Sequence, residues 1–224
     1  CTPSGIGHKN KEKYYHKFLK SGKGFLAQGS ESGFGKKYAR RINDATLNSD
    51  DQFIQIVSCN THNLCCIIHT LALDGDHDNL EEGRFVCIRR ANDISQSGSF
   101  IPSPQVGSHG SPKYGTHHAE DAAELFHTMD IDLNLFSSAV KVNSQYMHVL
   151  WFTLKVKEPT TLTAVLEKLY ANPYVAMTEK DMTSTVFSFG RDQGHFGRIL
   201  NQTVVVEQTL NHCSQAFGAL ADQC

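Results

Sequence analysis

The sequence predicts an α/β protein of the α+β kind, with a mixed, largely antiparallel sheet that is covered by helices on one face. Segments of strand character outnumber helical segments along the chain. After Leu135, long strands follow one another without intervening crossover helices. Because neighbouring parallel strands need such crossovers, this succession favours antiparallel or mixed pairing.

The first fifty residues predict one helix, one short strand and a long loop. Tyrosine, phenylalanine and leucine recur at helical spacing within 11–20, and Gly22 ends that helix. A short strand is expected at 24–27. The polar stretch 28–51 predicts a loop with one short helical piece near 37–43.

The centre of the chain predicts a buried strand that runs directly into a helix. The strand is expected at 53–57, and an apolar stripe predicts the helix at about 61–73, with Ser58 or Asn60 as its N-cap. The later elements are expected as an acidic turn at 74–83, strands at 84–90, 135–142, 147–156, 185–189 and 203–207, a long loop at 91–116, and helices at 118–128 and after Pro159.

Composition narrows the function classes. The 224 residues carry a net charge of −2 and are 40% hydrophobic, which suffices for a core and argues against a nucleic-acid or acidic-membrane footprint. No apolar run approaches the roughly 18 residues that span a bilayer, and no signal peptide is visible. The chain begins at Cys1 rather than at a methionine, so we expect a fragment of a longer protein.

The cysteines number seven, which is odd, and the chain is too large to need disulfide bonds for stability, so no disulfide framework is expected. Reduced cysteines fit a cytoplasmic location. Cys65, Cys66 and His69 lie close together, but they fall near the apolar stripe of one helix and are better explained as core. We therefore predict no metal site, although a small zinc-binding domain stays open as an alternative.

Cys59 gives the strongest chemical signal. It stands where a strand passes into a helix, and the positive end of the helix dipole stabilises a thiolate there. Free backbone N–H groups at the same place suit an oxyanion. The alternative is a buried structural cysteine. A nucleophilic thiolate needs an imidazole nearby in space, and His148, at the head of an apolar strand, is our candidate.

Two further pairs predict an anion cradle. Arg89 and Arg90 end a strand, and His117 and His118 open a helix. Guanidinium groups and a helix N-terminus both bind phosphate well. The alternative is that the two arginines are solvent-exposed at the end of their strand and that the two histidines only belong to the cap of their helix. No glycine-rich nucleotide fingerprint opens the chain.

The segment SCNTHNL at 58–64 resembles the SCNTTGL motif of archaeal-type glyceraldehyde-3-phosphate dehydrogenases, matching its first four residues and its last. Other blocks follow in register over residues 1–207. They are 1–10, which resembles the segment that closes the cofactor sheet, 28–30 (QGS for QGG), 89–93 (RRAND for RRGAD), 116–121 (THHAED for SHHGPD) and 147–148, where the family has its catalytic histidine.

The resemblance implies phosphorylating oxidation of glyceraldehyde 3-phosphate with NAD or NADP in glycolysis. Cys59 would attack the aldehyde, His148 would take the proton, and inorganic phosphate would cleave the thioester. A cytoplasmic homotetramer without nucleic-acid or membrane partners is implied. Substrate or phosphate contacts fall on Ser58, Asn60, Thr61, Arg89, His117, His118 and Ala119, and cofactor contacts on Gly29, Ser30 and Arg90.

The resemblance also divides the chain. Residues 1–58 would be the end of a Rossmann-type cofactor domain, 59–207 the catalytic domain, and 208–224 a divergent tail. The family's first hundred or so residues, with the loop that holds the pyrophosphate, have no counterpart here. We therefore expect poor cofactor binding and low activity from this chain alone.

Two other functions stay open from the sequence. The first is a semialdehyde or acyl-phosphate dehydrogenase that uses the same cysteine and histidine. The second is a truncated, non-catalytic module kept for oligomer contacts or regulation, in which Cys59 would react no faster than a simple thiol.

Overall fold

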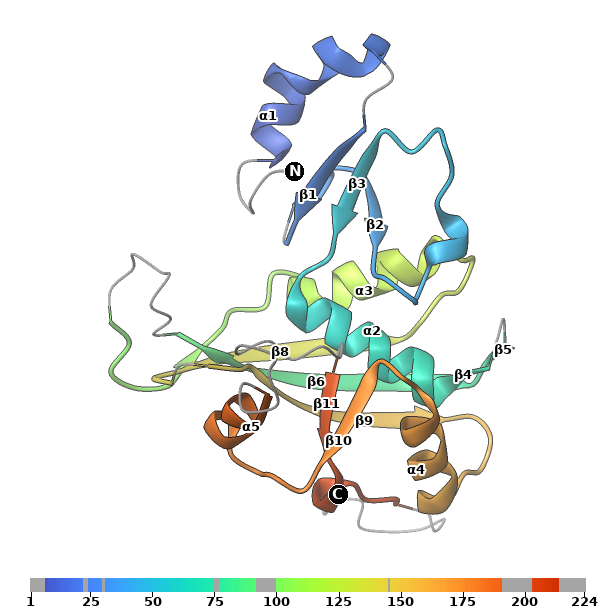
Figure 1. Ribbon diagram of the computed structural model, residues 1–224, viewed down its shortest axis with the longest axis vertical. Coiled ribbons are helices and arrows are strands. Elements are labelled where there is room, and N and C mark those ends of the chain that lie inside the picture. The colour runs from blue at the N-terminus through green and yellow to red at the C-terminus, as the bar shows by residue number, and fades with distance from the viewer. Residues whose placement is uncertain are drawn as a thin grey trace.

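The computed structural model describes residues 7–21, 24–29, 31–74, 77–91, 100–144, 146–190 and 203–213. A small parallel sheet forms one end of the molecule, and a larger mixed sheet lies beyond two central helices, α2 and α3 (Figure 1). The central helices contact elements on both sides.

The small sheet consists of β1 (Phe25–Gln28), β3 (Phe53–Ile56) and β2 (Lys36–Tyr38) in that order, all parallel. Helix α1 (Gly7–Lys13) and the 3-10 helix η1 (Tyr15–Ser21) precede it. Stacked aromatic rings hold these segments together: Tyr15 lies 4.4 Å from Phe25, and Phe25 lies 5.5 Å from Phe53, between ring centroids.

Two expectations for this part are wrong. The helix expected at 11–20 is two shorter pieces that meet at Tyr14. The helical piece expected near 37–43 is instead strand β2, followed by the 3-10 helix η2 (Asp44–Thr46). Pairing with β3 decides this, because it supplies long-range hydrogen bonds that local pattern does not reveal.

Helix α2 (Cys59–Ala72) forms the centre of the core and starts two residues before the expected position. Ser58 is its N-cap, and its hydroxyl accepts a hydrogen bond from the Thr61 N–H at 3.4 Å. Nine of its residues are buried. One side of α2 packs on α3 (His117–His127) and the mixed sheet, and the other on the C-terminal elements.

The mixed sheet has the order β7 (Gln105–Val106), β8 (Leu135–Val142), β6 (Leu80–Arg90) and β9 (Val149–Val156). Only the β6–β8 pair is parallel. Buried residues alternate along β6 and β8, and that face packs beneath α2 and α3. On the opposite face, Val149 and Trp151 are exposed. The predicted fold class is confirmed.

Most of the remaining elements follow the mixed sheet in the chain, and several of them pack on the other side of α2. Helix α4 (Leu162–Ala171), capped by Thr161, is followed by β10 (Val175–Thr178), α5 (Thr183–Gly190), β11 (Thr203–Val206) and the 3-10 helix η4 (Glu207–Thr209). Strands β10 and β11 pair in parallel, and a two-strand hairpin, β4 (Leu73–Asp74) with β5 (His77–Asp78), follows α2.

The strand expected at 185–189 is wrong, because that segment lies in α5. The backbone carbonyl of Met182 accepts the first hydrogen bond of this helix from Val186 and a second from the Thr185 hydroxyl. β-branched Thr185 and Val186 favour a strand by propensity, but a helical turn that satisfies its own backbone needs no partner strand.

Within the described part of the chain, no helix is long and apolar enough to cross a membrane. Cys59, Cys65, Cys66 and Cys87 are free thiols, whereas Cys213 is disulfide-bonded, which differs from the expectation of reduced cysteines.

Candidate functional site

Cys59 is the first residue of α2 and directly follows the end of β3 through Val57 and Ser58. Four thiols are free among the described residues, and Cys59 is the exposed one, while Cys65, Cys66 and Cys87 are buried in the core. Burial raises the pKa of the Cys66 thiol to about 11 and that of Cys87 to about 12. The sulfur that can meet a substrate is therefore the one at the helix N-terminus.

A chain of polar contacts links the start of α2 to the start of α3. The Ser58 hydroxyl lies 2.9 Å from the Thr61 hydroxyl and 3.5 Å from Nδ1 of His118. Asn60 and Thr61 are buried beside them. The two helix N-termini thus meet at one place, and their positive ends point to the same region.

A turn at Gly115 and the strand β8 position the start of α3. The Ser137 hydroxyl, on β8, accepts a hydrogen bond from the Ala119 N–H at 3.1 Å and lies 2.6 Å from the Thr116 hydroxyl. Ser137 therefore does the capping that the Thr116 side chain does not do. This arrangement fixes His117 and His118, whose ring centroids are 3.9 Å apart.

His118 is neutral at physiological pH. It is only 2% exposed, and burial, followed by the charges of His117, Arg89 and His148, lowers its pKa to about 3. Its Nε2 atom is buried and has no hydrogen-bond partner within the described residues. A buried imidazole nitrogen without a partner is costly unless a ligand or water completes it.

Arg89 brings positive charge to the same place from β6. Its charge helps to lower the pKa of both His117 and His118. Besides the dominant effect of burial, the pKa of the Cys87 thiol is lowered by Arg89 and raised by Cys59, so Cys59 and Arg89 both lie near Cys87. The Nε atom of Arg89 is buried and lacks a hydrogen-bond partner in the described structure. An oxyanion would satisfy both this atom and the nearby imidazole.

His148 is held by the end of β6. Its Nδ1 atom accepts the backbone N–H of Arg90 at 3.0 Å, and the Arg90 guanidinium donates to the Tyr146 carbonyl at 2.8 Å. In the neutral ring the proton therefore sits on Nε2. The charge of His148 helps to lower the pKa of His118, so the two imidazoles lie within electrostatic reach of each other. That Nε2 exchanges a proton with Cys59 stays a prediction.

Gly29 follows β1 at the carboxyl edge of the small parallel sheet, the edge from which Cys59 also leaves β3. Its φ of 91° is a conformation that favours glycine, and its carbonyl accepts a hydrogen bond from the Gln55 side chain at 2.8 Å. Ligands of such sheets bind at this edge. Ser30 lies outside the described residues.

The sequence reasoning missed a buried ion pair behind the site. Lys37 on β2 forms ion pairs with Asp121 and Glu124 on α3, and both Lys37 and Asp121 have side chains only 5% exposed. Burial lowers the pKa of Lys37, but the two carboxylates outweigh it and raise the pKa overall. Asp121 belongs to the THHAED segment at 116–121, and the resemblance of that segment to the family motif was the sequence signal for this residue.

The structure thus brings together most of the predicted residues. Ser58, Thr61 and His118 are in direct contact, and Arg89, His117 and His148 lie within electrostatic reach of His118. Among the described residues no group of three or more histidine, cysteine or acidic side chains could hold a metal ion. Cys65 and Cys66 are core residues.

No protein-family model matches the chain. Curated proteins do match, and they are named glyceraldehyde-3-phosphate dehydrogenase. The protein of Methanobacterium bryantii is 29% identical over 225 residues, which cover 94% of this chain and 60% of that protein. The protein of Methanothermus fervidus is 28% identical over 87% of this chain and 55% of its own length. That of Methanopyrus kandleri is 27% identical over 94% and 58%.

The chain is therefore similar, over about nine-tenths of its length, to a portion of the archaeal glyceraldehyde-3-phosphate dehydrogenases, which confirms the resemblance seen in its motifs. It spans somewhat more than half the length of the curated relatives that it matches.

Proposed function

We propose that this chain carries the catalytic portion of a phosphorylating glyceraldehyde-3-phosphate dehydrogenase, an oxidoreductase of glycolysis. The observation that carries the proposal is the meeting of two helix N-termini around Cys59. An exposed thiol lies beside Ser58, whose hydroxyl contacts a buried, neutral His118, and Arg89 adds charge from the adjacent strand. Similarity to enzymes of this name supports the same conclusion.

The first step is addition of the Cys59 thiolate to the aldehyde carbon of glyceraldehyde 3-phosphate. A carbon–sulfur bond forms, the carbonyl π bond breaks, and the carbonyl oxygen becomes the oxyanion of a thiohemiacetal. Free N–H groups at the start of α2 stabilise that oxyanion because they have no partner within the helix. His148 donates a hydrogen bond to that oxyanion from its Nε2–H, since its Nδ1 accepts the Arg90 N–H.

Oxidation then converts the thiohemiacetal to a thioester. NAD or NADP, when bound, would supply the acceptor for the hydride of the thiohemiacetal carbon, and the Nε2–H of His148 would keep its hydrogen bond to the oxygen as that oxygen becomes the thioester carbonyl. An oxygen of inorganic phosphate attacks the thioester carbonyl, the Cys59 thiolate leaves, and 1,3-bisphosphoglycerate is released. Arg89 and His118 have the unpaired donors that suit a phosphate group, together with His117 and the α3 backbone at Ala119.

Gly29 and Arg90, together with Ser30, would hold the cofactor, as the resemblance implies. The left-handed backbone at Gly29 supports this, because a residue without Cβ lets a ligand approach the main chain. Residues 1–58 then form the end of the cofactor domain, 59–207 the catalytic domain and 208–224 a separate tail. A cytoplasmic homotetramer follows from the same resemblance.

Acylation of Cys59 tests the proposal without the cofactor. Treating the chain with 1,3-bisphosphoglycerate should transfer the 3-phosphoglyceroyl group to Cys59, as seen by intact mass and peptide mapping. Cys59→Ser should abolish the adduct, and His148→Asn should slow its formation at least about tenfold. Cys66→Ser is the matched control and should behave as the unmodified chain, because Cys66 is buried.

Absence of any adduct, or an adduct that survives Cys59→Ser, contradicts the proposal. Equal acylation by β-aspartyl phosphate would favour the semialdehyde dehydrogenase alternative instead. Acylation of Cys59 that is no faster than acylation of a simple thiol would favour the non-catalytic alternative.

A further inference from the structure

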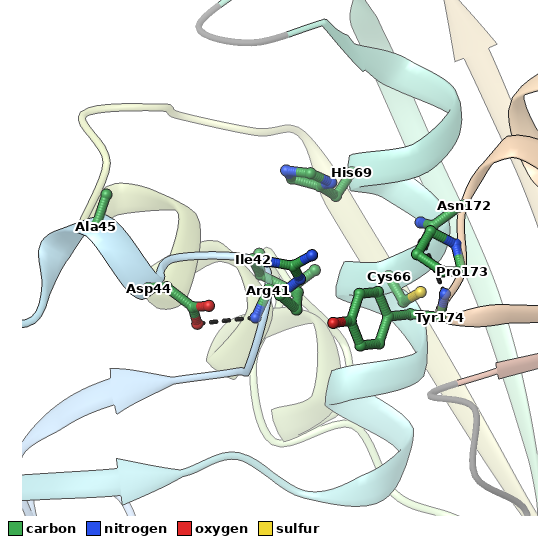
Figure 2. A pocket seen from close by; sticks show the side chains of 9 residues that line it. All are labelled: Arg41, Ile42, Asp44, Ala45, Cys66, His69, Asn172, Pro173 and Tyr174. Carbon is green, nitrogen blue, oxygen red and sulfur yellow. Dashed lines mark hydrogen bonds between the residues drawn. The ribbon is translucent and has the colours of Figure 1, made fainter.

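A cavity of about 460 Å³ lies along α2, away from the candidate site. Its walls come from the segment after β2, from Cys66 and His69 on α2, and from the turn between α4 and β10 (Figure 2). His69 is ten positions beyond Cys59, which is about 15 Å along a helix. No residue of the candidate site lines this cavity.

Three polar groups from three different segments line the cavity, and within the described residues none of the three is taken up by a side-chain hydrogen bond or an ion pair. The Arg41 guanidinium lies over the Tyr174 ring, 4.8 Å from its centroid, and has no carboxylate partner among the described residues. The His69 imidazole and the Tyr174 hydroxyl likewise make no hydrogen bond with any described residue. Burial lowers the pKa of His69, so its ring is neutral at pH 7 and offers one donor and one acceptor.

The other polar groups of the cavity are already used or oriented. The Asn172 amide donates to the Thr70 hydroxyl at 2.8 Å, and its oxygen accepts the Tyr174 N–H at 2.9 Å. One carboxylate oxygen of Asp44 accepts the Arg41 N–H and the Tyr38 hydroxyl. The second oxygen of Asp44 is left as an acceptor, on the opposite side of Arg41 from Tyr174 (Figure 2).

The backbone holds Arg41 in place before any ligand arrives. Its φ of 68° lies in the left-handed region, which costs free energy for a residue with a side chain. The hydrogen bond from its N–H to Asp44 (2.8 Å) and the bond from the Ile42 N–H to the Ala39 carbonyl (3.1 Å) fix this turn. These contacts fix the backbone of Arg41, and its contact with the Tyr174 ring orients the guanidinium, which reduces the entropy lost when it binds an anion.

We propose that this cavity binds a small anionic sugar derivative, either a sugar phosphate or a sugar acid. Its anionic group would be held by Arg41, His69 and Tyr174, and its hydroxyls would donate to the free oxygen of Asp44. Ile42 and Cys66, both buried, form an apolar floor beneath the carbon skeleton. The volume lies within the range of small-molecule sites.

Calorimetric titration of the purified chain tests this site. Ribose 5-phosphate should bind saturably, and Arg41→Gln should weaken binding about tenfold or more, because it removes a charged donor. Tyr174→Phe should weaken it less while keeping the ring. Arg84→Gln is the matched control, since Arg84 is exposed and pairs with Glu82 on the outer face of β6. Circular dichroism confirms that each variant is folded.

A further variant separates this cavity from the candidate active site. Arg89→Gln should leave ribose 5-phosphate binding at the cavity intact, whatever it does to catalysis. Gluconate binding would identify a carboxylate as sufficient, and inferior binding of gluconate would identify phosphate as the required group. Binding that is lost in Arg89→Gln but kept in Arg41→Gln, equal binding of uncharged ribose, or no binding at all overturns the proposal.

Discussion

At the scale of single residues, His118 shows how a buried side chain departs from its ordinary chemistry. Its ring lies between Ser58 and His117, with positive charge from Arg89 nearby. A cation is therefore disfavoured there, both because it loses water and because it meets like charges. The neutral imidazole can contact a substrate phosphate only as a hydrogen-bond donor, and the full charge must come from arginine.

We predict that His118 makes the folded chain sensitive to acid. The pKa of His118 is about 3 in the folded protein and near 6.5 when unfolded, so the unfolded state takes up the proton first as the pH falls. The free energy of unfolding should therefore decline between pH 6.5 and about 3, and His118→Asn should make that decline shallower. Urea denaturation at several pH values measures it.

The exposed His127, which pairs with Asp132 on the surface, supplies the control. His127→Asn should leave the slope nearly as steep as in the unmodified chain. A slope that is equally steep without His118 would show that other groups cause the acid sensitivity.

At the scale of elements, the turn that precedes α3 decides where the two histidines lie. Gly115 pairs with both Ser111 and Ser137 through isolated bridges, and the Thr116 N–H donates to the Ser137 carbonyl. The backbone at Gly115 lies so close to β8 that there is no room for a Cβ atom. The absence of a side chain at Gly115 therefore lets α3 start where it does, and this start positions the proposed phosphate site.

We predict that Gly115→Ala lowers the free energy of unfolding by about 1–3 kcal/mol. The φ of Gly115 is +73°, which is unfavourable for alanine, and the added Cβ would lie 2.2 Å from the Ser137 carbonyl oxygen. Equilibrium unfolding in urea measures this loss. Gly110→Ala is the matched control, since nothing lies within 4 Å of its added Cβ. Equal losses for the two variants would contradict the explanation.

At the scale of the whole molecule, the small sheet and the mixed sheet are joined through α2 and α3 (Figure 1). The ion pair of Lys37 with Asp121 is a buried polar link between β2 and α3. Because β2 belongs to the small sheet and α3 packs on the mixed sheet, this link ties the proposed cofactor side of the site to its proposed phosphate side.

We predict that Lys37→Met costs about 3–5 kcal/mol of unfolding free energy, because it leaves the buried Asp121 carboxylate without its cation. The pKa of Lys37 is raised above 10.5 in the folded state, so its contribution is present at neutral pH and is lost only above that value. The exposed pair of Lys155 with Glu81 is the control, and Lys155→Met should cost about 1 kcal/mol or less.

Chemical denaturation of the two variants measures both losses. A double variant, Lys37→Met with Asp121→Leu, should recover part of the lost stability, because it removes the uncompensated charge. Failure to recover any of it would assign the loss to packing rather than to charge.

Local sequence patterns were enough to predict the fold class, the strands at 53–57, 135–142 and 203–207, the helix that starts near Cys59, and the motif residues that resemble those of the archaeal enzymes. These features follow from local periodicity and capping, which neighbours along the chain supply. Short segments such as β2, β10 and α5 were missed or misassigned, because their conformation depends on distant partners.

Four features became visible only in the folded chain: the α2 and α3 N-termini meet, Ser137 caps α3, Lys37 pairs with Asp121, and Arg41 and His69 line one cavity. The physical reason is that each of these contacts joins residues far apart in the sequence. Their distances are set by how sheets and helices pack, and residue type alone carries no record of that packing.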